Sequence, residues 1–349
     1  MTITSLDVQN ISSGETARGW VGIIVLNWNG VADTLECLKS VEGMGFKDCR
    51  VYTVDNGSTD DSILELKDYF ETCHTGDCRV QILDIKDSFE PQSWRPSPFA
   101  WNLLLSLENR GFSGGCNLGI KAAIADGASW VFLLNNDATI GEGVVSLLLN
   151  LARREGAPAV CARMRHPDDG RTLFQGLSWP GLLFGFGEIP EALTIQEVWE
   201  SGYLEGSALL LSARMLAWRK ELDGYYLDPD YFLYCEDTDL CRWIASRGDR
   251  CLVVRDAWVD HRKTNSSGGE GSPLSYYYIT RNRIRLARKW LPLPARMLFL
   301  GYYYPSRLIR IGFHLMQRQW RVAQAILEGT WDGMLGHVGI WHRQKSKVH

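Results

Sequence analysis

Residues 21–26 read VGIIVL, a short apolar run that is typical of a parallel strand buried on both faces. A predicted helix with Leu35, Leu38 and Val41 on one side follows it, and a second strand is expected at residues 50–54. This alternation predicts a doubly wound, mostly parallel sheet flanked by helices, the α/β class. Further strands are expected at residues 80–85, 103–107 and 130–134, and helices at residues 33–41, from Ile63, at 120–126 and at 143–155.

The chain of 349 residues is long enough for one α/β domain with an appendage. We expect a flexible N-terminus at residues 1–19, the α/β domain at 20–270 and a C-terminal helical region at 271–349. Within the domain, the proline-rich residues 86–99 predict a surface insertion, and residues 160–215 look irregular. The C-terminal region is expected to hold helices at residues 276–291 and 305–327.

Composition excludes several classes of protein. A net charge of −4 and a pI near 6.0 give no electrostatic case for binding nucleic acid. The nine cysteines are scattered and odd in number, so reduced thiols are expected rather than a disulfide framework. Residues 1–19 lack the charged and apolar segments of a signal peptide, and no apolar run of about 18 residues predicts a spanning helix. We therefore expect a cytoplasmic protein.

Two acidic clusters follow apolar stretches. Residues 130–134 lead directly into Asn135, Asn136 and Asp137, and the apolar residues 231–234 lead towards Glu236 and Asp237. If both stretches are strands of one sheet, their carboxylates reach its carboxyl edge, where open α/β sheets bind ligands. One carboxylate with neutral oxygen donors can hold Mg²⁺ or Mn²⁺ against substrate phosphates, so Asp137 is a candidate metal ligand.

The second cluster has the features of a catalytic pair. Asp239 suits the start of the helical stretch that follows it, which leaves Glu236 and Asp237 free to face a cleft. Because adjacent carboxylates repel, one of the two is expected to have a raised pKa, as a general base requires. His261 ends a predicted strand at residues 253–261 and could add a nitrogen ligand beside Asp137.

Two segments are candidates for nucleotide binding. Asp55 ends the second strand before a tight turn and can accept hydrogen bonds from a base or ribose, although the same residues also suit an ordinary turn. Residues 109–119 predict a glycine-rich loop whose backbone approaches a diphosphate, with a purely structural loop as the alternative. Its glycines, at 111, 114, 115 and 119, do not match GxGxxG, so a dinucleotide site is disfavoured.

Taken together, these segments resemble glycosyltransferase family 2, the inverting sugar transferases with a GT-A fold. The resemblance spans residues 21–267, and its Asn-x-Gly-Phe segment and Asn-Asn-Asp motif are closest to the rhamnosyltransferase-like branch. Order and spacing both agree in the matching pieces, which are IVLNWN (24–29), VDNGSTD (54–60), NRGFSGGCNLG (109–119), LNND (134–137), EGSA (205–208), EDTDLCR (236–242) and His261.

The resemblance implies a role for each matching residue. Asp237, with Glu236 beside it, stands at the catalytic base, and Asp137 and His261 stand at the ligands of a divalent metal, Mg²⁺ or Mn²⁺. Gly206 and Ser207 lie in the segment that borders the acceptor. Asn135 and Asn136 depart from the often fully acidic metal motif of the family, which weakens its charge balance. The implied donor-binding residues are Asn27, Asn29, Asp55, Asn109, Gly111, Gly114, Gly115, Asn117 and Asn136.

The implied reaction moves a sugar from a nucleoside-diphosphate sugar, such as dTDP-rhamnose or a UDP-sugar, to a hydroxyl group. The acceptor would be a glycan or a lipid-linked acceptor in the synthesis of cell-surface polysaccharide. A nucleotidyltransferase remains an alternative, but residues 27–30 lack the basic part of its glycine-rich loop. A non-catalytic nucleotide-sugar-binding protein is a second alternative, and it would have no need of Glu236 and Asp237.

The C-terminal region is rich in cations. Arg281, Arg283, Arg285, Arg288 and Lys289 occupy one predicted helix, and Arg307, Arg310, Arg318 and Arg321 lie further on among aromatic side chains. Such a surface could make peripheral contact with anionic lipid on the inner face of the cell membrane, which would suit a lipid-linked acceptor. The alternative is a helical cap on the catalytic domain or the contact of a homodimer.

Overall fold

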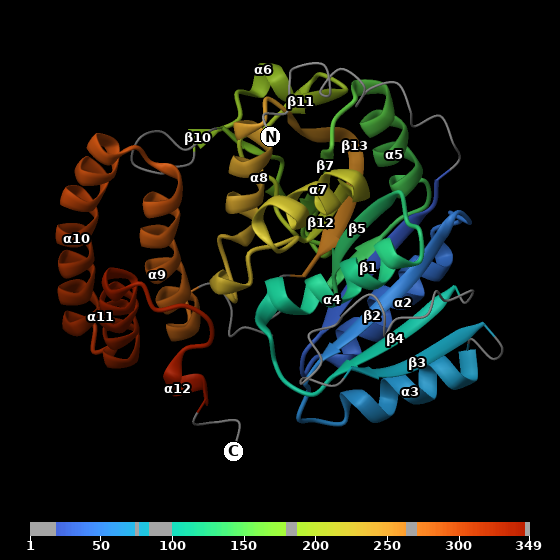
Figure 1. Cartoon of the computed structure of the whole chain (residues 1–349), viewed down its shortest axis with the longest axis horizontal. Helices are drawn as coiled ribbons and strands as arrows, with labels where there is room; N and C mark the ends of the chain where they lie inside the picture. The colour runs from blue at the N-terminus through green and yellow to red at the C-terminus, as the bar shows by residue number, and fades with distance from the viewer. Residues whose placement is uncertain (1–18, 74–76, 84–99, 179–186, 263–270, 346–349) are drawn as a thin grey trace.

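The computed structural model describes residues 19–73, 77–83, 100–178, 187–262 and 271–345 (Figure 1). Residues 1–18 of the predicted N-terminus and the predicted insertion at 86–99 lie outside the described residues. The chain forms a mixed α/β structure with a central, mostly parallel sheet, and a C-terminal helical region follows it.

The described strands of the central sheet follow the spatial order β11-β13-β7-β12-β5-β1-β2-β4-β3, with β6 beside β13 and β8 beside β7. Neighbouring strands from β5 to β3 are parallel, whereas β12 runs antiparallel to both of its neighbours. The strands are β1 (Val21–Asn27), β2 (Cys49–Asn56), β3 (Cys78–Leu83), β4 (Trp101–Ser106), β5 (Trp130–Asn135), β6 (Ala138–Ile140), β7 (Ala159–Arg165), β8 (Thr172–Phe174), β11 (Val198–Glu200), β12 (Ala208–Ser212) and β13 (Cys251–His261).

Helices connect and flank these strands, and a short separate ribbon pairs β9 (Leu177–Ser178) with β10 (Gly187–Glu188). The helices are α2 (Val31–Gly43), α3 (Ser62–Cys73), α4 (Gly111–Ala125), α5 (Val144–Glu155), α6 (Glu191–Thr194), α7 (Ala213–Asp223), the 3₁₀ helix η1 (Pro229–Tyr231), α8 (Glu236–Ser246), α9 (Pro273–Trp290), α10 (Leu293–Met316), α11 (Trp320–Leu335) and α12 (His342–Lys345).

The opening strand behaves as its sequence predicts. Ile23, Ile24 and Val25 of β1 are at most 1% exposed and lie between β2 and β5. β1 pairs with a strand on each edge and is covered on both faces, so an uninterrupted apolar run is stable in this position. The predicted doubly wound α/β class is confirmed, with strand and helix ends shifted by a few residues.

The predicted glycine-rich loop is wrong, because α4 already begins at Gly111. Its glycines serve close packing instead. A Cβ atom at Gly115 would lie 2.5 Å from Leu26 Cδ1, and one at Gly119 would lie 2.6 Å from Ile24 Cγ2. Glycine is the residue that lets a helix approach the sheet this closely, so its abundance here reflects helix–strand contact as much as any ligand.

Two further predictions of secondary structure are wrong. Residues 231–234 form no strand, because η1 ends at Tyr231 and the backbone then turns through positive φ at Phe232, Tyr234 and Cys235. Residues 160–215 are not simply irregular, since β12 lies near the centre of the sheet. Its five residues, ALLLS, are too short to show a period, although all are buried.

The C-terminal helices α9, α10 and α11 stand beside the sheet domain (Figure 1). The single helix predicted at residues 305–327 is wrong, because α10 ends at Met316 and α11 begins at Trp320. Pro305 lies inside α10 rather than starting a helix. None of the helices that the structure describes combines the length and hydrophobicity that crossing a bilayer requires.

Candidate active site

Asp55 lies at the carboxyl end of β2 and is fully buried. Its carboxylate accepts hydrogen bonds from Asn27 Nδ2 at 2.7 Å, from Ser58 Oγ at 2.7 Å and from the Ser58 backbone N–H at 3.0 Å. Asn27 ends β1 in register with Asp55. The predicted strand-end carboxylate is therefore held by its neighbours, and it fixes the two turns that follow β1 and β2.

A chain of hydrogen bonds connects Asp55 at the end of β2 to Asn136, the residue that follows β5. Thr34 Oγ1 donates to Asn27 Oδ1 at 2.7 Å, and Asn136 Nδ2 donates to Thr34 Oγ1 at 3.0 Å. Asn29, with φ +50°, accepts a hydrogen bond from the Thr59 backbone N–H. Four predicted donor-binding residues, Asn27, Asn29, Asp55 and Asn136, thus lie together, whereas Thr34 was not foreseen because nothing in its local sequence marks it.

Asn109, Asn117 and the glycines of α4 lie around the start of that helix. Asn109 Oδ1 accepts from the Gly111 N–H at 2.8 Å, so the side chain supports the first turn. Asn117 exchanges two hydrogen bonds with the Leu227 backbone, at 2.8 and 2.9 Å. The Phe232 carbonyl accepts from the Phe112 N–H, and a Cβ atom at Gly111 would lie 2.2 Å from that carbonyl oxygen. These residues join α4 to the segment before α8.

Asp137 and His261 form a close pair, as their sequence positions predict. His261 Nε2 lies 2.9 Å from Asp137 Oδ1, and both side chains are less than a tenth exposed. Pairing of His261 with Ala138 between β13 and β6 produces this contact across 124 positions of sequence. The other ring nitrogen, Nδ1, is buried without a hydrogen-bond partner.

The pair fits a divalent cation. Two ligands that bind Mg²⁺ at about 2.1 Å and at right angles lie about 3 Å apart, close to the separation of Nε2 and Oδ1. No group of three or more His, Cys, Asp or Glu side chains among the described residues could enclose an ion. Two protein ligands suit an ion that is completed by substrate phosphates and water rather than by a protein cage.

A small cavity of about 60 Å³ adjoins Asp137. Its lining includes Asp33, Glu36 and Asp260 together with Arg262, whose guanidinium bonds to Glu36. The Arg262 backbone N–H also donates to the Asp137 carbonyl at 3.1 Å. The surroundings of Asp137 are therefore more acidic than the Asn-Asn-Asp motif indicates, which favours a cation at this position.

Asp237, on the first turn of α8, keeps a partly exposed surface. Burial raises the pKa of its carboxyl to about 6, while hydrogen bonds from the Tyr203 hydroxyl and the Thr238 N–H limit the rise. Tyr203 donates to Oδ2 at 2.7 Å and Thr238 donates to Oδ1 at 2.6 Å. A carboxylate with a pKa near 6 is ionised at neutral pH and remains a usable base.

Glu236 differs from its neighbour because it is buried, and its Oε2 atom has no hydrogen-bond partner. Burial, followed by the charge of Asp237, raises its pKa well above the usual range. The expected raised pKa of a neighbouring carboxyl pair thus applies to both residues. Burial thus disfavours ionisation of Glu236 more strongly, which makes Asp237 the candidate base of the pair.

Asp239 has the opposite environment. It is fully buried and pairs with the guanidinium of Arg219, which is also fully buried. Lys289 Nζ and Trp290 Nε1 donate to its carboxylate at 2.9 and 2.8 Å. The prediction that Asp239 caps the helix is wrong, because α8 already begins at Glu236 with Cys235 as its N-cap residue. The charge of Asp239 is instead neutralised by α7 and α9.

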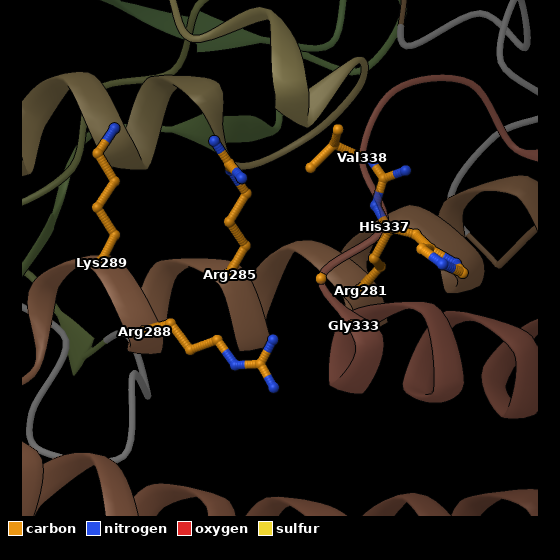
Figure 2. Close-up of a pocket in the computed structure, with 8 residues that line it drawn as sticks. Arg281, Arg285, Arg288, Lys289, Gly333, His337 and Val338 are labelled. Carbon is orange, nitrogen blue, oxygen red and sulfur yellow. The ribbon is translucent and has the colours of Figure 1, made fainter.

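Cations of α9 also bind the segment that leads into α8. Burial opposes ionisation of Asp228, but Arg285 and Lys289 outweigh it and lower its pKa. In Figure 2 the side chains of Arg285 and Lys289 extend from α9 towards this segment, whereas Arg288 points in another direction. All three side chains line a cavity of about 270 Å³. Arg281 is 2% exposed and donates to the Tyr231 carbonyl at 2.9 Å. The basic side chains of α9 that contact this segment therefore join α9 to the sheet domain, as expected for the helical cap that the sequence left as the alternative to lipid contact.

Strand pairing explains why these distant residues meet. The ends of β1, β2 and β5 lie in register, and β13 runs parallel to β7 on the far side of antiparallel β12. Asn135 Nδ2 donates to Ser207 Oγ at 3.0 Å, and the Gly206 N–H donates to Asp237. Contacts therefore run continuously from Asp55 through Asn136 and Ser207 to Asp237, along one edge of the sheet.

Part of the chain matches a known protein family. Residues 94–202 match the model of the family described as glycosyl transferase family 2. That segment contains Asp137 and the start of α4 but ends before Gly206, Asp237 and His261. No curated protein sequence matches the chain.

The fold is similar to several solved glycosyltransferase structures. The mannosyltransferase PcManGT of Pyrobaculum calidifontis, with GDP-Man and Mn²⁺, is 15% identical with a TM-score of 0.54, over 94% of this chain and 93% of that chain. GalNAc-T7 with UDP, GalNAc and Mn²⁺ is 10% identical with a TM-score of 0.55, over 83% and 55%. S. aureus TarS with UDP-GlcNAc is 13% identical with a TM-score of 0.51, over 91% and 92%.

At these identities the structural likeness establishes the fold alone, and the family model matches only residues 94–202. The sheet order, the helical C-terminal region and the match over residues 94–202 agree with one another. Residues 94–202 are thus similar to glycosyl transferase family 2, and the chain has a GT-A fold.

Proposed function

We propose that this protein is an inverting glycosyltransferase that moves a sugar from a nucleoside-diphosphate sugar to a hydroxyl group. The observation that carries the proposal is Asp237, a partly exposed carboxylate whose pKa is raised to about 6. It lies on the sheet edge that also holds the Asp137–His261 pair. A base next to a candidate diphosphate site is the arrangement that displacement at an anomeric carbon requires.

Asp237 removes the proton of the acceptor hydroxyl as its oxygen attacks the anomeric carbon. The nucleoside diphosphate departs from the opposite face, so the anomeric configuration inverts. Tyr203 donates a hydrogen bond to Asp237 Oδ2 at 2.7 Å and so fixes the orientation of the carboxylate. The other oxygen, Oδ1, accepts from the Thr238 N–H and would accept the proton of the acceptor hydroxyl. General base catalysis of this kind contributes roughly 10²–10⁴-fold to the rate.

Asp137 and His261 would hold the divalent cation. When bound, such an ion stabilises the negative charge of the diphosphate leaving group. The similar structures of PcManGT and GalNAc-T7 contain Mn²⁺, which supports a divalent metal for this chain. Asn136, tied to Thr34, sets the position of the strand end from which Asp137 extends.

The predicted donor-binding residues serve the same proposal. Asn27, Asn29 and Asp55 stabilise the turns after β1 and β2 by hydrogen bonds, and the base and ribose would lie at these turns. The donor is proposed to be dTDP-rhamnose or a UDP-sugar, from the rhamnosyltransferase-like motifs of the sequence. A glycan or lipid-linked hydroxyl is the proposed acceptor, within cell-surface polysaccharide synthesis. We further propose that residues 20–270 form the catalytic domain and residues 271–349 a helical region that supports it.

A donor screen tests the proposal. The protein is incubated with a panel of nucleoside-diphosphate sugars, Mn²⁺ and simple glycoside acceptors, and free nucleoside diphosphate is measured. Product is then analysed by NMR for its anomeric configuration. We expect diphosphate release with at least one donor and inversion in the product.

Three outcomes would contradict the proposal. Consumption of nucleoside triphosphate with a sugar phosphate would indicate a nucleotidyltransferase instead. Binding of donors without turnover, under conditions in which the acceptor is saturating, would indicate a binding protein. A product with retained configuration would exclude the direct role of Asp237.

A further inference from the structure

Helix α10 exposes a broad apolar surface to solvent. We define its outer face as the apolar side chains that are about half or more exposed, which are Leu293, Met297, Leu298, Tyr302, Leu308, Ile309, Phe313 and Met316. Ile309 and Met316 are 74% and 79% exposed. Scattered exposed apolar residues are ordinary, but a continuous apolar face along 24 residues of helix indicates a binding surface.

This face is additional to the side of α10 that stabilises the fold. Phe299 and Tyr303 are 1% and 2% exposed, and they lie in a cluster with Ile284 and Ala287 of α9. Figure 1 shows α10 on the side of α9 that faces away from the central sheet. The helix therefore has a satisfied inner side, and its outer face must be explained by another partner.

The charge around this face is one-sided. From residue 271 to residue 327 the sequence holds no Asp or Glu, although the whole chain has a net charge of −4. The same 57 residues carry ten cations, which are Arg281, Arg283, Arg285, Arg288, Lys289, Arg296, Arg307, Arg310, Arg318 and Arg321. Arg310, Arg318 and Arg321 are exposed near the junction of α10 and α11. An apolar face bordered by unopposed cations complements a surface that is both apolar and anionic.

A second copy of the chain fits this pattern less well. In a two-fold dimer the same patch faces itself, so the cations of residues 271–327 would meet a segment that has no acidic residue to pair with them. Trp320 and Trp331 of α11 are also more than half exposed, and tryptophan is enriched where proteins meet the interface of a bilayer. These features favour lipid over self-association.

We propose that the outer face of α10 lies on a bilayer surface that contains anionic phospholipid. The apolar side chains enter the region between head groups and acyl chains, and the nearby arginines contact lipid phosphates. The helix lies along the surface rather than across it, since none of the described helices is apolar enough to span. The proposal narrows the contact to α10, whereas the sequence had indicated the basic C-terminal region as a whole. The inference does not depend on the proposed sugar transfer.

Vesicle flotation with the full chain tests the proposal. Vesicles of phosphatidylglycerol and phosphatidylcholine in equal parts are compared with vesicles of phosphatidylcholine alone. We expect the protein to float with the mixed vesicles and to bind them at least about tenfold more strongly, with binding weakened by salt. Equal binding to both vesicle types, or binding to neither, would overturn the proposal.

Variants locate the contact. Ile309→Gln combined with Met316→Gln changes only exposed side chains and is expected to lower vesicle binding at least about tenfold. Arg310→Gln with Arg318→Gln is expected to lower it by about fivefold or more for each charge removed, and to reduce its salt dependence. Leu64→Gln is the matched control, because Leu64 is 68% exposed on α3, outside the outer face.

The remaining outcomes are also decisive. If Leu64→Gln weakens binding as much as the α10 variant does, the location on α10 is wrong. If sedimentation shows a dimer that Ile309→Gln and Met316→Gln convert to a monomer without any lipid, the occupant is a second copy and the lipid proposal is overturned. Circular dichroism of each variant confirms that the helices are retained.

Discussion

The acidic side chains at the start of α8 lie in two different electrostatic environments. Glu236 and Asp237 face protein with few compensating donors, and their pKa values are raised. Asp239, two residues further on, is surrounded by Arg219, Lys289 and Trp290. Three acidic residues within four positions therefore have different uses, because their side chains leave the helix in different directions. The C-terminal helices neutralise the structural carboxylate and leave the candidate catalytic pair uncompensated.

The largest expected effect comes from Asp237→Asn, which removes the base without changing the shape of the side chain. The rate of transfer should fall by roughly 10²–10⁴-fold. Donor binding, measured by titration calorimetry with a nucleoside-diphosphate sugar, should change little, because Asp237 contacts the acceptor side. A variant that retains transfer within about tenfold of the parent would remove Asp237 from the mechanism.

Asp239→Asn should act on stability instead. It leaves the buried Arg219 guanidinium without its partner, and breaking such a pair costs about 3–5 kcal/mol of unfolding free energy. Asp223→Asn is the matched control, since Asp223 faces the same arginine at 3.8 Å but is a quarter exposed, and it should cost less than about 1 kcal/mol. Denaturation by urea measures both. Equal losses would show that the two sides of α8 do not differ as described.

His261→Ala tests the candidate metal pair at the other end of the sheet edge. Loss of the ring nitrogen beside Asp137 should weaken Mn²⁺ binding by at least about 10–100-fold, the range found even for indirect partners of a metal. Electron paramagnetic resonance of free Mn²⁺ measures this without any turnover. His166→Ala, at a histidine outside the pair, should leave the affinity unchanged. Unaltered Mn²⁺ affinity in His261→Ala would place the ion elsewhere.

The smallest expected effect is on the pH dependence of stability. The pKa of Asp237 is about 6 when folded and about 3.9 when unfolded, so folding favours its protonated form. Its favourable contribution is complete below about pH 4 and is lost as the pH rises through about 6. Relative to Asp237→Asn, the parent should therefore lose about 1–2 kcal/mol of unfolding free energy between pH 4 and pH 7.5. Urea denaturation at both pH values measures the difference, and a constant difference would contradict the raised pKa.

The sequence predicted local structure well where the pattern was strong. The run at residues 21–26 has no alternative to a buried strand, and the turn after Asp55 follows from its own residues. Prediction failed where residues serve distant contacts. The glycines of α4 look like a loop, but they are required by Leu26 and Ile24, which are remote in sequence. Residues 231–234 look like a strand because they are apolar, yet they turn at positive φ while Asn282 and Arg281 bind their carbonyls.

Some residues of the candidate site could likewise be predicted from the sequence, whereas others could not. Asp137 and His261 could be identified from residue type and position at strand ends, and the structure brings them together. Asp237 was identified by residue type although the strand predicted before it is absent, and it contacts the same edge through the Gly206 N–H. Thr34 and Tyr203 also contribute to these connections, but hydroxyl side chains are too common for sequence to single out. The individual partners of the α9 cations were equally hidden, because they lie about 50 positions away.

The sequence by itself determined the α/β class, most of the order of strands and helices over residues 21–155, and the chemical types available at those strand ends, because hydrophobic periodicity and turn chemistry act over a few residues. Only the tertiary structure decided which carboxylate is neutralised and which keeps a raised pKa, and which helix of the C-terminal region faces solvent with apolar side chains. Charge compensation and burial depend on groups brought together across the fold, so neighbouring residues as alike as Asp237 and Asp239 can acquire different properties.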